Sequence, residues 1–271
     1  MEHYLRERSS LSNRGSEFSC PESCDRHGCR EPNLHISITV IDLIAIASVS
    51  GRRPLAVFRE DVKIGFDPIR ENEPWMGRVN MELKKSCRFL DGKWCSVYPR
   101  RPLACGLFPE YFFLTNQWKT LLEKEIFQKF PCLRSPCSVS PARKEALDRM
   151  MELSIQETFL SDFYLFGVSP FLLDLKNIIG ERLEGIDATK EGKTRIPYER
   201  IEGLVAQKFL NSGHLEEWEK KIEALDETSA IGNLIEMKNG TDRLAKNNDV
   251  GPRIGIAHQF DGARLLAIHL P

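Results

Sequence analysis

The stretch Cys87-Arg-Phe-Leu-Asp-Gly-Lys-Trp-Cys95-Ser-Val-Tyr-Pro-Arg-Arg-Pro-Leu-Ala-Cys105-Gly-Leu-Phe-Pro109 decides what fold the sequence predicts. Asp91-Gly92 between two strand-like runs predicts a β-hairpin. A three-residue loop, 91–93, would put Cys87 and Cys95 on one face of that hairpin, because side chains alternate along strands. A two-residue loop, 91–92, would put them on opposite faces. If the two sulfurs share one metal ion, the longer loop is expected.

Outward from this stretch, the cysteines are confined to residues 20–137. The eight are Cys20, Cys24, Cys29, Cys87, Cys95, Cys105, Cys132 and Cys137. In a cytosolic protein such clusters bind metal more often than they form disulfides. Thiolates suit zinc and iron, including iron–sulfur clusters. We therefore predict all eight as metal ligands, with two four-sulfur sites, one site with spare cysteines, or one multi-metal cluster all left open.

The bulk properties predict a cytoplasmic protein. The polar N-terminus lacks the apolar segment of a signal peptide, and the longest apolar run, 36–49, is interrupted by Asp42 and is too short to span a membrane. Lys and Arg number 38 against 39 Asp and Glu, which favours neither nucleic acid nor an anionic membrane as partner. A protein substrate or partner is left open, as is the oligomeric state.

The pattern predicts an α+β fold in three parts. Residues 1–18 are expected to be a flexible tail, 19–139 an irregular cysteine-rich metal-binding unit with short β-hairpins, and 140–271 a mainly helical region ending in a hairpin. A buried helix is expected over 39–50 with Gly51 as its stop, and a strand over 55–66. Segment 110–130 is read as a hairpin, or as a strand and then a helix. Ser140-Pro141 predicts the start of a helix to residue 166. Further helices are expected over 169–183, 197–211 and 214–238, and a terminal hairpin turning at Asp261-Gly262.

The quoted stretch resembles the signature of the zinc- or iron-chelating cysteine-cluster family, also called YkgJ-type. That signature has a Cys, Phe-Leu, a short turn, Cys-x-Ile/Val-Tyr-x-x-Arg-Pro-x-x-Cys and an aromatic-Pro, and this chain matches it from Cys87 to Pro109. An upstream cluster and an apolar helix with an acidic residue occupy the family's remaining positions, although the family's Cys pair is Gly28-Cys29 here. The resemblance implies zinc or iron binding, with an iron–sulfur cluster included. It also implies a relation to flagellin lysine N-methylases, so the alternative function is a protein-modifying iron–sulfur enzyme.

Two residues beside the cysteines match the family's Tyr-x-x-Arg-Pro. Arg101 has five donors, which suit the sulfurs around an anionic cluster, and Tyr98 lies next to it in the motif. We predict that both support the ligands, against the alternatives of a structural ion pair and a core tyrosine. His27, and less so His35, are further candidate ligands. Asp42 is expected to pair with Arg101 or with a backbone donor.

Overall fold

The computed structural model describes residues 1–16, 18–68, 76–169, 171–174, 203, 207, 211–227, 230–236, 256–261 and 264–269. It has an α+β fold, as predicted. The helices are α1 (Glu2–Asn13), α2 (His27–Arg30), α3 (Val40–Ser50), α4 (Pro54–Asp61), α5 (Leu103–Leu107), α6 (Glu110–Leu114), α7 (Trp118–Glu123), α8 (Glu125–Gln128), α9 (Pro131–Arg134), α10 (Pro141–Phe166) and α13 (His214–Glu223). Two 3-10 turns, η1 (Tyr98–Arg100) and η2 (Ala224–Asp226), accompany them.

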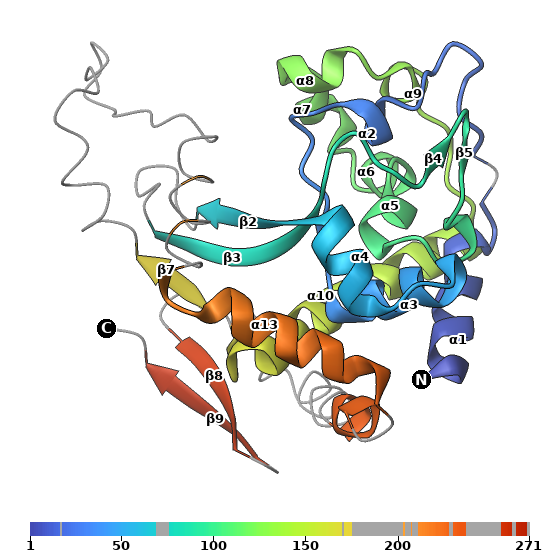
Figure 1. Ribbon diagram of the computed structural model, residues 1–271. Coiled ribbons are helices and arrows are strands. Elements are labelled where there is room, and N and C mark those ends of the chain that lie inside the picture. The colour runs from blue at the N-terminus through green and yellow to red at the C-terminus, as the bar shows by residue number, and fades with distance from the viewer. Residues whose placement is uncertain are drawn as a thin grey trace, which may run out of the picture.

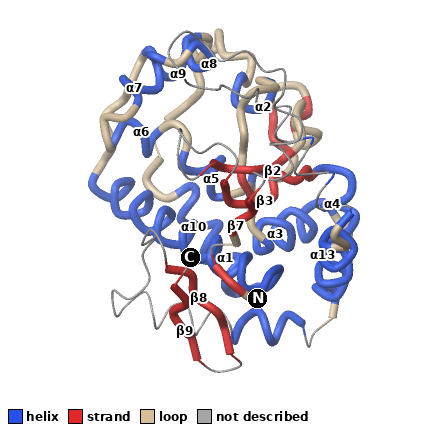
Figure 2. Tube along the Cα trace, turned by 90° about the vertical axis from the view of Figure 1, so that its left-hand side faces the viewer, coloured by secondary structure: helices blue, strands red, loops and turns tan. Residues whose placement is uncertain are grey.

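The strands form three antiparallel sheets. They are β1 (Ser37–Ile38), β2 (Val62–Pro68), β3 (Met76–Leu83), β4 (Leu90–Asp91), β5 (Trp94–Cys95), β6 (Val168–Ser169), β7 (Leu172–Asp174), β8 (Ile256–Asp261) and β9 (Arg264–His269). The largest sheet has the order β1-β3-β2, with β7 also paired to β3; β4 pairs with β5, and β6 with β8 and β9. The short helices α6–α9 and the β4–β5 hairpin gather at one end of the molecule, while α1, α3, α10 and α13 lie at the other (Figures 1 and 2).

Local signals placed two helices correctly. Thr39 and Asp42 form a capping box at the start of α3, and Gly51 ends it with φ 64°, a left-handed conformation that glycine adopts without cost. The side chain of Ser140 caps α10, with Pro141 in its first turn. The predicted terminal hairpin is also found, as β8 and β9.

Four predictions of secondary structure are wrong. Residues 55–66 form α4 and then β2 instead of one strand, and 110–130 hold α6, α7 and α8 instead of a hairpin or strand. In place of a helix from 169, the described residues 172–174 form β7. The helix expected over 197–211 lies largely outside the described residues.

The predicted tail is the fourth of these errors. Glu2–Asn13 form α1, and Arg8 on this helix is 2% exposed. Arg8 donates to Glu157 on α10 through Nε at 2.9 Å and also to Asp42 on α3. Tyr4 adds a 2.6 Å hydrogen bond to Glu157. The helix is therefore docked on α3 and α10 by a buried charge network. The polar composition of residues 1–18 gave no indication of this docking.

The main core lies between the inner face of the large sheet and the helices. Phe66, Val79 and Met81 alternate inward along β2 and β3 and are almost fully buried. The apolar helix α3 packs there on all sides, together with Trp218 of α13. Residues of the opposite sheet face, such as Asp67, Arg78 and Asn80, are polar.

Replacing Arg8 tests the docking of α1. In the Arg8→Met variant, Asp42 and Glu157 would be left buried without their cation, so we expect a loss of about 3–5 kcal/mol in the free energy of unfolding, measured by urea titration. Arg6→Met on the exposed side of α1, where Arg6 pairs with Glu2, should change the free energy of unfolding by less than about 0.5 kcal/mol. Equal, small losses for both variants would contradict a docked helix.

Candidate metal centre

Four cysteines from distant parts of the chain gather at the end of the molecule that carries the β4–β5 hairpin. We call them group A: Cys29 in α2, Cys87 in the turn after β3, Cys95 in β5 and Cys105 in α5. The backbone of Cys87 donates to the carbonyl of Cys29 at 3.0 Å, which joins the first two directly. Arg26 donates to the Lys93 carbonyl at 2.8 Å and so fastens the start of α2 to the hairpin.

Burial and mutual repulsion raise the pKa values of these thiols. Burial, with the nearby Cys87 and Cys95 thiolates, raises the pKa of Cys29 to about 11. Burial also raises the pKa of Cys105, and Cys29, Cys87 and Cys95 all raise it further. Each sulfur therefore resists ionisation while the others are charged, so a bound cation would be needed to hold them together as thiolates.

A second set, group B, contains Cys20, Cys24 and Cys132. Burial raises the pKa of Cys132 to about 12, with further contributions from Cys24 and Cys20. Cys24 and Cys132 are buried, whereas Cys20 is exposed. Cys132 belongs to an aromatic cluster with Phe113, Phe130 and Leu133. Cys137 is exposed in the segment between α9 and α10.

The hairpin register differs from the one expected for shared ligation. Leu90 pairs with Cys95 and Asp91 with Trp94, so the loop is Gly92-Lys93 rather than 91–93. Strand alternation does not decide where Cys87 points, because Cys87 lies in a turn before β4 begins. The two sulfurs are nevertheless close enough for Cys87 to raise the pKa of Cys95.

Two cations face group A. The guanidinium of Arg101 lowers the pKa of Cys95 and Cys105 against the larger effect of burial, and its Nε is buried with no hydrogen-bond partner among the described residues. Lys85, which the sequence did not single out, donates to the Gly28 carbonyl at 2.6 Å and favours the charged forms of Cys29 and Cys87. Such a donor set, four soft sulfurs flanked by positive charge, fits an anionic metal–thiolate site.

The remaining predicted residues have other partners. Tyr98 is 46% exposed and lies under Arg101, whose Cζ is 4.3 Å from the ring centroid, so it is not a core tyrosine. Asp42 accepts from the backbone N–H of Thr39 at 2.9 Å, which is one of the two expected partners, and it pairs with Arg8 rather than with Arg101. His27 stacks edge-on against Phe130 at 5.7 Å beside group B. His35 is held by Glu82 through Nδ1 at 2.8 Å.

Helices outside the cysteine-rich segment hold Cys105 in place. Arg143 of α10, 1% exposed, donates to the carbonyl of Gly106 at 3.3 Å and to Glu110 at 2.7 Å. The same guanidinium donates to the carbonyl of Leu11 at the end of α1 at 3.1 Å. A side chain at Gly106 would lie 2.6 Å from Met150 of α10, which shows how tightly this turn is packed.

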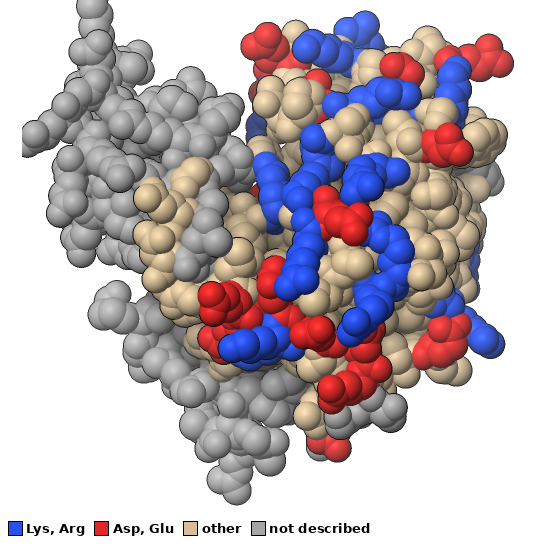
Figure 3. Space-filling view, viewed as in Figure 1, with Lys and Arg blue, Asp and Glu red and all other residues tan. Residues whose placement is uncertain are grey.

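Positive side chains are frequent over α4 and the neighbouring loops, with acidic ones among them (Figure 3). Many are paired: Arg59 binds Glu219 at 2.7 Å, and Arg52 binds Asp61 at 2.6 Å. Lys84 caps the end of α4 by donating to the Arg59 carbonyl at 2.9 Å. The face is thus an ion-pair network around the end of α4.

The comparisons with known proteins agree with this donor set. Residues 19–132 match the CxxCxxCC family model, described as "putative zinc- or iron-chelating domain". This segment is a domain of that family. It contains both cysteine groups and ends at Cys132. No curated protein and no solved structure matches the chain, and the relation to flagellin lysine N-methylases stays a prediction.

Two further findings complete the description of the site. Within the described ranges, no three His, Cys, Asp or Glu side chains stand at the spacing of a finished metal site. Among the described residues, no helix is long and apolar enough to cross a membrane.

Arg101 gives a test of the charge around group A. We expect Arg101→Met to weaken metal binding by roughly 10–100-fold, the usual effect of removing a group that supports the ligands, as measured by competition with a chromogenic chelator. Arg100→Met is the matched control, because Arg100 bonds to Ser48 and Glu2 instead of facing the sulfurs. An equal effect of both variants would show that Arg101 acts only on stability.

Proposed function

We propose that the cysteine-cluster domain holds two separate metal sites, one in each cysteine group. Group A supplies four thiolates from Cys29, Cys87, Cys95 and Cys105. Group B supplies Cys20, Cys24 and Cys132, with Cys137 or His27 as the fourth ligand. The observation that carries this proposal is the 3.0 Å hydrogen bond from the Cys87 backbone to the Cys29 carbonyl, which joins two distant cysteines of group A. In agreement with this division, group A thiols raise the pKa of Cys105 and group B thiols raise that of Cys132.

Four thiolates around one position make a closed site, which is the arrangement of structural zinc and of iron–sulfur clusters. Group A joins α2, the turn after β3, the β4–β5 hairpin and α5. These elements are short, and the sheet β4–β5 has two residues in each strand. A metal bound there would stabilise them by fixing four points of the chain, and the sulfurs would complete their approach as the ion binds.

The positive charges of Lys85 and Arg101 support the proposal because they favour the thiolate forms of the group A cysteines. A dication with four thiolates carries a net charge of about −2, which two nearby cations stabilise. Group B has a similar neighbour, because Arg26 lowers the pKa of Cys20 against the effect of burial. We propose no reaction for either site.

Metal analysis of single variants tests the two-site proposal. The protein would be purified without oxygen, and its zinc, iron and acid-labile sulfide measured. Cys29→Ser and Cys132→Ser should each remove the metal of one site, and the double variant should remove both. Visible absorbance would identify iron–sulfur, whereas a colourless zinc protein would identify thiolate zinc.

The two single variants serve as controls for each other. A shared multi-metal cluster would lose all its metal in either variant, and that result would contradict two sites. The helix content of the whole chain, followed by circular dichroism, shows whether a variant has lost metal alone or its fold as well.

A further inference from the structure

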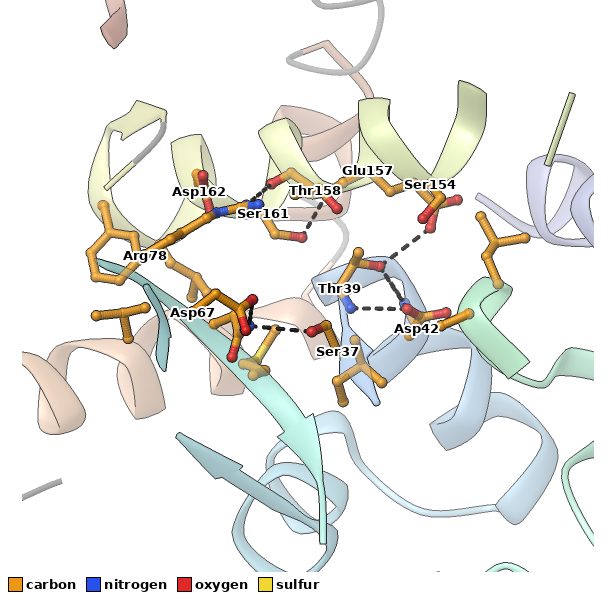
Figure 4. Close-up of a pocket in the computed structure, with 18 of the residues that line it drawn as sticks. Ser37, Thr39, Asp42, Asp67, Arg78, Ser154, Glu157, Thr158, Ser161 and Asp162 are labelled. Carbon is orange, nitrogen blue, oxygen red and sulfur yellow. Dashed lines mark hydrogen bonds and ion pairs between the residues drawn. The ribbon is translucent and has the colours of Figure 1, made fainter. Parts of the chain in front are cut away.

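A gap in the large sheet forms a pocket that Leu103 and Ala104 of α5 also line. On one edge of β3, β1 pairs at Met81 and Glu82, and β7 pairs at 76–78. Val79 and Asn80 lie between these two pairings and have no strand opposite them on that edge among the described residues. Helix α10 crosses the opening and leaves a pocket of about 120 Å³ (Figure 4).

The wall of the pocket carries more carboxylates than cations. Among the described residues, Asp42, Asp67, Glu157 and Asp162 line it, against the guanidinium of Arg78. Arg78 is 2.7 Å from Asp162 and so offsets one of them. Arg8 lies behind Asp42 and Glu157 and offsets one charge of that pair.

Asp67 has no ion pair among the described residues and is held by the amide of Asn80. Asp67 is exposed at the pocket mouth. Desolvation and the Glu82 carboxylate raise its pKa, while Arg78, the Asn80 amide and His35 lower it. Burial, with the nearby Asp42, likewise raises that of Glu157 in spite of Arg8. Among the described residues, four carboxylates thus face two guanidinium groups, Arg8 and Arg78, and a positive ligand would relieve this excess of negative charge.

The rest of the lining fits a ligand with an apolar body and N–H donors. Ser37 and Thr158 bring hydroxyl groups to the wall, while Val79, Met81 and Leu103 form apolar surface. The volume is somewhat below the ~150 Å³ of an engineered cavity that binds benzene, so the ligand would have about five or six heavy atoms. We propose that this pocket binds a small organic cation, an ammonium group on a short alkyl chain.

The test uses the full chain with its metal and three ligands of equal heavy-atom count: butylammonium, butanol and propionate. In calorimetric titrations butylammonium should bind at least about tenfold more tightly than butanol, because hydrogen bonds to charged groups are the strong ones. Propionate should not bind. Equal binding of butylammonium and butanol would overturn the proposed charge selectivity.

Two variants locate the binding. Asp67→Asn should weaken butylammonium binding about tenfold, and Asp148→Asn, an exposed change on the same helix as the pocket wall, should not. Ser154→Leu should fill the pocket and abolish binding while the melting temperature and metal content stay unchanged. Absence of binding in the wild type, or unchanged binding in both pocket variants, would overturn the proposal. Since each readout is ligand binding and not metal content, failure here is distinct from failure of the two-site proposal.

Discussion

The buried contact of Arg8 with Asp42 and Glu157 joins three helices that have little else in common in sequence. Asp42 also accepts from the Thr39 backbone at 2.9 Å, so one carboxylate both caps α3 and binds α1. Because all three charges are withdrawn from water, each depends on the others: removing one would leave a buried charge unpaired. The position of α1 is thereby fixed relative to α10.

A second buried arginine links α1 and α10 to the helix that contains Cys105. Arg143 binds the end of α1, the carbonyl of Gly106 and the carboxylate of Glu110. Gly106 follows Cys105, so the place of one sulfur depends on two helices that lie outside the family segment 19–132. Helices α1 and α10 therefore help to position Cys105 of group A. The boundary predicted from cysteine content does not separate two independent cores, because the main core contains residues from both sides of it.

The sequence was informative where structure is decided locally. Thr39, Gly51 and Ser140-Pro141 act within one helical turn, so α3 and α10 could be placed to within a residue. The prediction of one strand over 55–66 is wrong because α4 begins at Pro54. The apolar residues that follow Pro54 are as common in strands as in helices, so the sequence pattern favoured a strand. The prediction of a flexible tail is wrong for a different reason. Helix α1 is held by Arg8, whose partners lie 34 and 149 positions away in the sequence. Contacts of that range leave no trace in a local pattern.

The same distinction applies to the cysteines. Spacing and motif name the candidate ligands and Arg101, but they do not show which cysteines lie together in the fold. Cys29 is closer in sequence to Cys20 and Cys24 than to Cys87, yet its backbone is bonded to Cys87. The bond exists because α2 turns the chain toward the hairpin, where Arg30 donates to the Gly92 carbonyl at 3.3 Å. Which cysteines lie near one another is therefore decided by packing between α2 and the hairpin, and spacing alone would have kept the first three cysteines together.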